Sequence, residues 1–331
     1  MQNRREFVKE VVVGAAVLKT ASPFALGAAK PSSSGAKSKV VIVRDAKLRT
    51  PGPAPDPARV AALLDHAMQA YFGAKNPVDP WKRIVRPGQR VSLKVNTLGR
   101  ALSPNVALVA AICERLQQAG IKLGDITVWD RSSRDMQSAG FKLSSTPGAV
   151  RFVASDTAGY EDAPTSFGAV TTHLAKILTE SDVMLNLPVL KNHSLAGVTM
   201  AMKNMYGVIN NPNAMHGTNC NPYIADLNMI PQIRQKMKFI IGDMMTAVYE
   251  GGPGYKPEFA WNENGIIVGE DRVAIDQTCA GIIERKRAEK GLPTLEQKNT
   301  PTHYIATAAD AQHALGTNDP TRIALIEHNI A

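Results

Sequence analysis

Cysteine is scarce in this chain of 331 residues. The three cysteines are Cys113, Cys220 and Cys279, and none belongs to a Cys-x-x-Cys pair. At most one disulfide can therefore form, and an iron–sulfur cluster held by this chain alone is not expected, because such clusters normally take four cysteine ligands. Cys113 and Cys279 lie in apolar helical patterns typical of small core residues, whereas Cys220 lies in a polar loop where its thiol can be exposed.

Several common catalytic motifs are also absent. No Gly-x-Gly-x-x-Gly follows the first expected strand, and the chain has no Walker phosphate loop, no Gly-x-Ser-x-Gly elbow and no His-Glu-x-x-His. Ordinary dinucleotide, nucleoside-triphosphate and serine-hydrolase chemistry is therefore disfavoured. Aromatic residues make up only 5% of the chain, but 44% of it is hydrophobic, which is typical of a compact α/β protein.

The amino-terminal apolar run is too short for a stable membrane span. Residues 11–18 would rise about 12 Å as a helix, against about 30 Å of hydrocarbon. The preceding Asn3-Arg4-Arg5-Glu-Phe-Val-Lys is similar to the twin-arginine export motif, and small residues follow at 25–29. We expect a twin-arginine signal peptide at 1–29, a flexible spacer at 30–39, the twin-arginine translocase as export partner, and a periplasmic or otherwise extracytoplasmic mature protein. The alternative is a chance basic start on a cytosolic protein.

Positive charge predominates but is scattered. The net charge is +9, and removing residues 1–29, which hold four basic and two acidic groups, leaves +7. The clusters at 82–83 and 285–287 lack the interleaved aromatic residues of a nucleic-acid surface, so they are better interpreted as solvated helix faces. No nucleic-acid partner is expected. A mild positive field can still draw small anions toward a cleft.

Strand and helix patterns alternate along residues 40–331. Strands are expected at 40–44, 90–95, 126–130, 151–154, 182–190, 239–241, 265–268 and 304–307, and helices at 57–72, 105–119, 133–141, 196–208 and 271–290, with a short closing helix. This alternation predicts an α/β fold, a mostly parallel sheet flanked by helices, in one large domain or two closely packed lobes.

Basic and imidazole groups interrupt the apolar stretch at 187–209. Lys191 and His193 are two apart, so they would share one face of an extended chain. Thr199, Lys203 and Tyr206 would share one face of the expected helix. Such groups are costly to bury unpaired, and ligands in open α/β sheets bind at the carboxyl ends of strands. The junction of strand and helix is therefore a candidate site.

Polar residues also recur where other expected strands end. Asn96, Asp130 and Asp243 occupy such positions, as does His193. Singly, each has a simpler explanation: Asn96 and Asp130 can cap helices, Asp243 can satisfy a turn, His193 can be a buried hydrogen-bonded histidine, and Lys203 can extend its amine to solvent. Together they predict that groups distant in the chain converge on one hollow.

The chain resembles the domain of unknown function 362 family. That signature joins Leu-Pro-x-x-Lys-x-His to Thr-x-x-x-Lys-Asn-x-x-Gly, and the matching residues here are Leu187, Pro188, Lys191, His193, Thr199, Lys203, Asn204 and Gly207. Further matches are Lys94, Asn96, Asp243 and the segment 269–276, so the resemblance covers roughly residues 40–285. It implies fold and site, since the family name records no activity. Val95 replaces the family's usual proline, which makes that loop less rigid, and the cysteine clusters of some relatives are missing.

Two functional hypotheses follow. In the first, an exported enzyme binds a small anionic or hydroxylated metabolite: Lys191 and Lys203 hold an anion, His193 moves a proton, and Asp243 orients the histidine or binds a divalent metal. The expected ligand-binding residues are Lys94, Asn96, Asp130, Thr199 and Asn204. Isomerase, lyase and hydrolase chemistry remain open, as does the cofactor. The second hypothesis is a non-catalytic binding or accessory protein of an extracytoplasmic redox system. In a third interpretation, the polar residues only stabilise the sheet ends.

Overall fold

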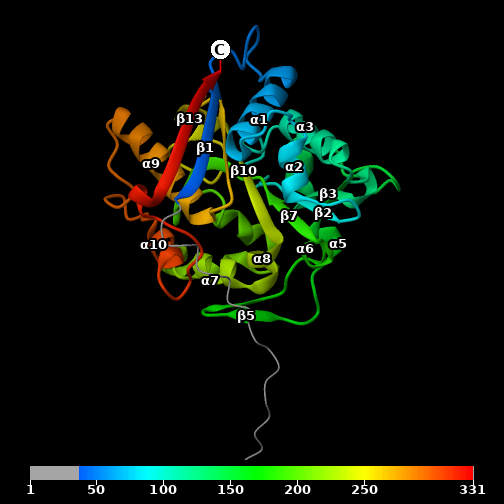
Figure 1. Ribbon diagram of the computed structural model, residues 1–331. Coiled ribbons are helices and arrows are strands. Elements are labelled where there is room, and N and C mark those ends of the chain that lie inside the picture. The colour runs from blue at the N-terminus through cyan, green and yellow to red at the C-terminus, as the bar shows by residue number, and fades with distance from the viewer. Residues whose placement is uncertain (1–36, 331) are drawn as a thin grey trace, which may run out of the picture. The chain divides into compact units, whose positions relative to one another are not determined.

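A mixed, mostly parallel β-sheet runs through the centre of the fold. The computed structural model describes residues 37–330 (Figure 1). The expected signal peptide and most of the expected spacer lie outside these residues. The strands, in spatial order, are β13 (Ile323–Ile330), β1 (Ser38–Asp45), β12 (Gly265–Gly269), β10 (Met237–Val248), β7 (Val183–Asn186), β2 (Val91–Lys94), β3 (Ile126–Asp130) and β4 (Arg151–Ala154).

Strand directions confirm the expected α/β class. Strand β12 is antiparallel to both β1 and β10, whereas the other neighbouring strands in that order are parallel. Two short strands, β8 (Val189–His193) and β11 (Ala260–Trp261), also pair with β10, and a third, β9 (Gly197–Thr199), pairs with β8. A separate hairpin is formed by β5 (Thr165–Phe167) and β6 (Val170–Thr172).

Helices cover both faces of the sheet. One face carries α1 (Pro57–Phe72), α2 (Asp79–Ile84) and α3 (Val106–Gln118), and the other carries α7 (Tyr223–Met229), α8 (Pro231–Lys236), α9 (Arg272–Glu289) and α10 (His303–Ala309) (Figure 1). Shorter helices are α4 (Ser133–Ser138), α5 (Ser155–Ala158) and α6 (Lys176–Glu180). In β1, Val40 and Ile42 enter one apolar core and Val41 and Val43 the other, because successive strand side chains point to opposite faces.

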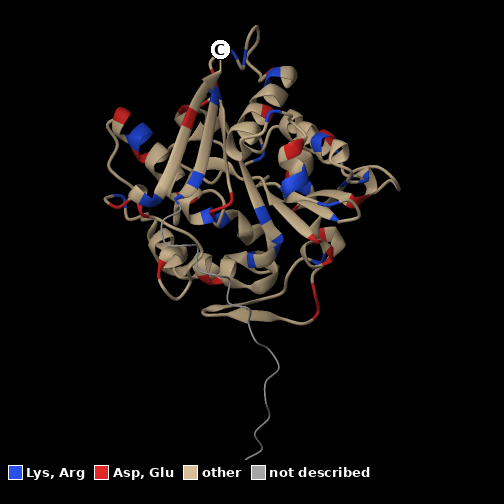
Figure 2. Ribbon diagram, in the orientation of Figure 1, with Lys and Arg blue, Asp and Glu red and all other residues tan. Residues whose placement is uncertain are grey.

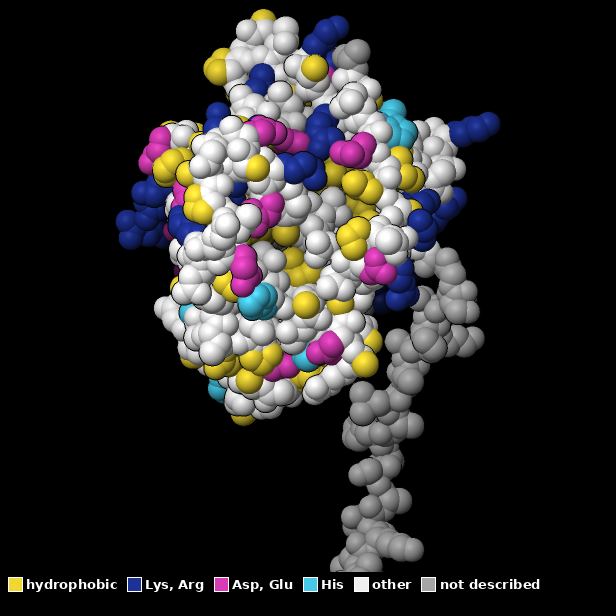
Figure 3. All heavy atoms as spheres, turned by 90° about the vertical axis from the view of Figure 1, so that its left-hand side faces the viewer, with side chains coloured by type: hydrophobic (Ala, Val, Ile, Leu, Met, Phe, Trp, Pro, Cys, Tyr) yellow, Lys and Arg dark blue, Asp and Glu magenta, His cyan; other side chains and the backbone are white. Residues whose placement is uncertain are grey.

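Charged residues of both signs are spread along the described chain. Lysine, arginine, aspartate and glutamate are interspersed along the ribbon in Figure 2, and both signs alternate with apolar side chains on the face drawn in Figure 3. Residues 37–330 form one compact unit, so the alternative of two lobes does not apply to them. No helix among these residues is long and apolar enough to cross a membrane.

The motif region folds differently from the sequence expectation. Proline has no N–H for a ladder hydrogen bond, and the expected strand at 182–190 divides at Pro188 into β7 and β8. The expected helix at 196–208 is wrong. Its start is β9, which pairs antiparallel with β8 and opposes Thr199 to Lys191, and its end is a 3-10 helix, η2 (Lys203–Val208). A buried carboxylate, Asp276, accepts the N–H groups of Ala201 and Met202, which diverts them from helical hydrogen bonding.

Two expectations near the carboxyl terminus and one near the amino terminus are also corrected. The expected strand at 304–307 belongs to helix α10, where the hydroxyl of Tyr304 donates to Asp276 at 3.0 Å. The expected closing helix is strand β13, because its full length pairs in parallel with β1. Strand β1 begins at Ser38, so the last residues assigned to the spacer belong to the sheet. Tertiary pairing outweighs local propensity at these positions.

Candidate functional site

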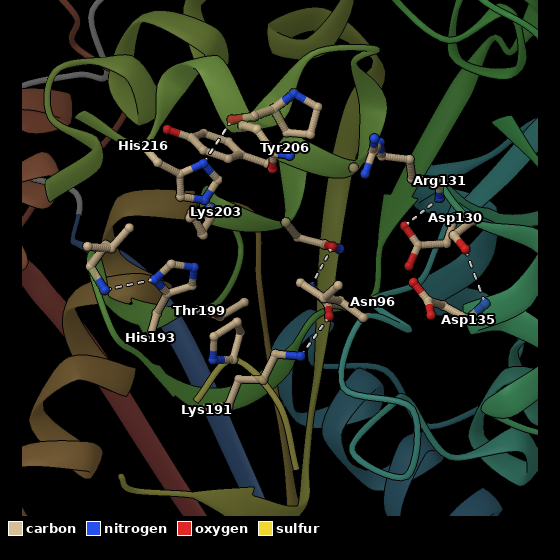
Figure 4. A pocket seen from close by; sticks show the side chains of 18 of the residues that line it. Asn96, Asp130, Arg131, Asp135, Lys191, His193, Thr199, Lys203, Tyr206 and His216 are labelled. Atoms are coloured by element: carbon tan, nitrogen blue, oxygen red, sulfur yellow. Dashed lines mark hydrogen bonds between the residues drawn. The ribbon is translucent and has the colours of Figure 1, made fainter. Parts of the chain in front are cut away.

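A pocket of about 300 Å³ opens where β2, β3 and β8 end. Seven of the nine predicted site residues line it: Asn96, Asp130, Lys191, His193, Thr199, Lys203 and Asn204. Figure 4 shows Lys203, His216 and Tyr206 at one end and Arg131, Asp130 and Asp135 at the other. The predicted convergence of distant polar residues is therefore observed for these seven.

His193 closes the tight turn between β8 and β9. Its Nδ1 accepts the N–H groups of Leu195 at 3.1 Å and Ala196 at 3.2 Å, and Gly197 follows with a φ of +74°. Since Nδ1 is an acceptor, the neutral ring carries its proton on Nε2. Burial, aided by the positive charge of Lys203, lowers the pKa of His193 to about 2. The imidazole is thus a neutral hydrogen-bond donor.

Lys191 is fully buried and has a single neutral partner. Its Nζ donates to Asn96 Oδ1 at 2.8 Å, and within residues 37–330 no carboxylate lies within ion-pair distance of it. Burial lowers the pKa of Lys191 to about 8, and the more distant attraction of Asp130 offsets this only in part. The amine therefore lacks a local counter-charge.

Lys203 is held between aromatic rings. Its Nζ lies 3.3 Å from His216 Nε2 and 3.4 Å from the ring centroid of Tyr206. It too has no carboxylate partner in the described part of the chain, and burial lowers the pKa of Lys203 to about 7. An amine with this pKa exchanges its proton near neutral pH.

Thr199 supplies a hydroxyl that no described protein atom satisfies. The residue is 3% exposed, lines the pocket and has no hydrogen-bond partner for Oγ1. An unsatisfied buried polar group costs about 1 to 3 kcal/mol, so this hydroxyl favours a ligand that can bond to it.

Lys94, Asn96, Asp130 and Asn204 form a polar network, and all of these residues except Lys94 line the pocket. The Nζ of Lys94 donates to Asp130 Oδ1 at 2.6 Å and to Asn204 Oδ1 at 3.2 Å, and Asn96 Nδ2 donates to Asn204 Oδ1 at 3.0 Å. Burial alone would raise the pKa of Asp130, but the ammonium of Lys94 and hydrogen bonds from Thr97 hold it below its usual value. These groups bond to one another and thereby support the pocket.

Two predicted site residues, Lys94 and Asp243, do not line the pocket. Lys94 acts within the polar network just described. Asp243 instead accepts the N–H groups of Asn105 at 2.7 Å and Met245 at 2.8 Å, and burial raises its pKa to about 6. Asp243 is therefore placed to hold the backbone at the start of α3. It does not orient His193, whose hydrogen bonds come from the β8–β9 turn.

Sequence reasoning missed His216, Arg131 and Asp135, which also line the pocket. His216 lies in a polar loop with no periodic pattern, and its nearness to Lys203 depends on chain folding. The same loop contains Cys220, whose thiol is buried and not exposed, and burial raises its pKa. Thr218, Asn219 and Cys220 all have positive φ, a strained arrangement for residues other than glycine and one that clusters at functional sites.

No group of three or more His, Cys, Asp or Glu side chains in residues 37–330 is arranged to hold a metal ion. All three cysteines are unpaired and buried. The polar groups that line the pocket are amine, imidazole, amide and hydroxyl groups, with Arg131, Asp130 and Asp135 at one end.

Comparison with known proteins identifies the family. The sequence matches the family described as Domain of unknown function (DUF362) over residues 91–281, which is more than half of the chain. The chain belongs to the DUF362 family. The matched range contains every predicted site residue, from Lys94 to Asp243.

Individual relatives are more distant. A thylakoid-associated protein of Synechocystis sp. is 29% identical over 140 residues, which cover 40% of this chain and 43% of that protein. The lactate racemase apoprotein from Thermoanaerobacterium thermosaccharolyticum is 11% identical with a TM-score of 0.43, covering 73% of this chain and 56% of that one. A Thermotoga maritima protein is 9% identical with a TM-score of 0.36, covering 73% and 60%.

Proposed function

We propose that this DUF362 chain is an enzyme that binds a small anionic or hydroxylated metabolite in the pocket and moves a proton through Lys203. One observation carries the proposal: two buried lysines, Lys191 and Lys203, face one pocket without a carboxylate partner in residues 37–330. Buried charges are normally paired. A bound anion would supply the missing charge to both amines.

The hydrogen-bonding groups around the two lysines suit an oxyanion. Thr199 Oγ1 and the Nε2–H of His193 are both available as donors to a bound oxygen atom. Because they are fixed by the β8–β9 hairpin, they need no reorganisation when charge develops on the ligand. Donors of this kind contribute about 10² to 10³-fold each to a rate.

We assign proton transfer to Lys203 and not to His193. His193 uses Nδ1 to accept two backbone N–H groups, so it cannot also act as a base through that atom. Lys203 combines a pKa of about 7 with access to the pocket. General acid–base transfer by such a group contributes about 10² to 10⁴-fold. Isomerase, lyase and hydrolase reactions are all compatible with this set of groups.

A thermal-shift series tests the proposal. Acetate, lactate, phosphate and succinate would each be titrated into the protein slightly below neutral pH, and a ligand at 100 times its Kd would stabilise the fold by about 2.7 kcal/mol. Lys191→Met and Lys203→Met should lose this stabilisation. Lys82→Met changes an exposed lysine and should retain it. Stabilisation that persists equally in both pocket variants would exclude the pocket as the anion site.

We further propose that the protein is exported by the twin-arginine translocase and is extracytoplasmic when mature. Support comes from Arg4 and Arg5 with the apolar run that follows them. Replacing both arginines by lysine keeps the charge but removes the guanidinium pair. Fractionation of a host with this translocase should then find the full-length variant inside the cytoplasm and the shortened parent chain outside it. Equal distribution of both would contradict export by this route.

A further inference from the structure

Lys203 and His216 form a pair that the acid–base proposal does not fully use. His216 Nδ1 lies 2.9 Å from the carbonyl oxygen of Pro212, which can only accept, so Nδ1 carries the ring proton. Its Nε2 therefore bears a lone pair and accepts from Lys203 Nζ at 3.3 Å. The rings of His193 and His216 stack at 5.8 Å with opposite tautomers, one offering a donor and the other an acceptor.

The environment of Lys203 is suited to an amine nucleophile. Tyr206 covers one side of the amine, and no carboxylate among the described residues holds it as an ammonium. Burial lowers the pKa of Lys203 to about 7, with the charge of Lys191 acting in the same direction, so neutral amine is present near neutral pH. A lysine that is desolvated beside another cationic group is one known route to a nucleophilic amine.

We infer that Lys203 forms a Schiff base with a small 2-oxo acid, with His216 as the proton carrier. This inference rests on the proposed function, because it needs the pocket to accept an anion. It narrows the proposed ligand to an anion with a carbonyl group, and it proposes that the ligand becomes covalently attached to the protein.

The covalent step balances with the groups present. His216 Nε2 takes a proton from the Lys203 ammonium, and the free amine attacks the carbonyl carbon, so that a C–N bond forms while the carbonyl oxygen takes the electron pair. A proton moves from nitrogen to that oxygen to give the carbinolamine. His216 then returns its proton to the hydroxyl, water leaves, and a protonated imine remains. No oxidant or reductant is required.

The remaining pocket groups favour a carboxylate next to the carbonyl. Lys191 offers a second cation within the same pocket, where it can pair with the carboxylate of the acid. Thr199 Oγ1 and the Nε2–H of His193 are the donors available for the oxygen that becomes negative during attack. A pocket of about 300 Å³ lies at the small end of ligand sites, which suits a metabolite of a few carbons.

Borohydride trapping tests the inference directly. The protein would be incubated with glyoxylate or pyruvate, reduced with sodium borohydride, and digested for mass spectrometry. We expect one reduced adduct per chain, located on Lys203. Lys203→Arg keeps the positive charge but cannot form an imine, so its adduct should disappear, whereas Lys82→Met should retain it. His216→Gln should slow adduct formation by about 10²-fold.

The outcomes separate this inference from the proposed function. Stabilisation by acetate or lactate without a trapped adduct from either 2-oxo acid would overturn the Schiff base and leave the anion site intact. An adduct on Lys191 or on surface lysines alone would likewise overturn the assignment to Lys203. Failure of every tested anion to stabilise the parent protein, together with no adduct, would count against both proposals.

Discussion

Two buried lysines, Lys94 behind the pocket lining and Lys203 within it, have opposite surroundings. Lys94 is fully buried and bonds to Asp130, Asn204 and the carbonyl of Val95. Lys203 is nearly as buried, yet its polar neighbour is the neutral His216. Equal burial therefore leads to different consequences: the paired lysine supports the structure, whereas the unpaired one retains a reactive amine. Whether a buried lysine has a carboxylate partner therefore decides its role more than its degree of burial does.

The largest expected difference is in stability. Lys94→Met leaves the Asp130 carboxylate buried without its cation and should lower the free energy of unfolding by about 3 to 5 kcal/mol, the usual cost of removing one member of a buried pair. Lys203→Met removes a buried amine with no counter-ion and should leave stability unchanged or raise it near neutral pH. Urea unfolding of the two variants measures the difference. Equal losses of stability in both variants would remove the distinction between the two lysines.

The pH dependence of stability sharpens the same comparison. The folded-state pKa of Lys203, about 7, is below its unfolded value of about 10.4, so the unfolded chain binds more protons between these values. Stability contributed at this site should therefore rise with pH from about 7 to about 10, by at most about 1.4 kcal/mol per unit. Below about pH 7 the contribution is constant. The advantage of Lys203→Met over the parent chain should accordingly shrink as pH rises, and a constant advantage would show that the amine is not perturbed.

Gly207 tests how closely the network packs. A Cβ at this position would lie 2.5 Å from Lys94 Nζ and 2.8 Å from Asp130 Oδ1, both of which are fixed by the ion pair. Gly207→Ala should therefore cost about 1 to 3 kcal/mol. Gly254→Ala is a matched control, because a Cβ there meets no atom within 4 Å. If the two alanine variants unfold at the same urea concentration, the network has room that the distances do not indicate.

The sequence predicted the sheet and most of the pocket, for physical reasons that differ between its elements. Strands such as β3 and helices such as α1 and α9 carry their own apolar patterns and capping residues, so local reasoning located them within a few residues. Lys191 and His193 were correctly placed on one face because β8 is extended. Thr199 and Lys203 reach the pocket even though the helix expected to carry them does not form.

Long-range partners account for what the sequence could not predict. Asp276 accepts N–H groups from Ala201 and Met202, about 75 residues earlier in the chain, and so prevents the expected helix. Asp243 was grouped with the site because it follows an apolar strand, but its carboxylate bonds to Asn105 at the start of α3. His216 had no signal beyond its loop position. A residue's partner across the fold is not encoded in its neighbours along the chain.

The buried His313 extends the comparison of paired and unpaired basic side chains, and its substitution gives the smallest expected change in stability. Its Nε2 lies 2.9 Å from Asp226 Oδ1 and its Nδ1 lies 2.8 Å from Asp310 Oδ1, so both ring nitrogens face carboxylates. Burial opposes protonation, but the two acids raise the pKa of His313 above its usual value. Its stabilising contribution is then fully present below about pH 6.5 and is lost as pH rises through the folded-state pKa, opposite in direction to the contribution of Lys203.

His313→Gln should therefore lower stability by about 1 kcal/mol in mildly acidic solution and by less in mildly alkaline solution. Urea unfolding of both chains at the two pH values measures this, and titration of the His313 ring protons by NMR reports its pKa directly. Because the variant keeps Lys203, the pH dependence that the two chains share cancels in their difference. If the difference in the free energy of unfolding between the two chains widened as pH rises, His313 would be neutral in the fold. The two carboxylates would then not hold it as a cation.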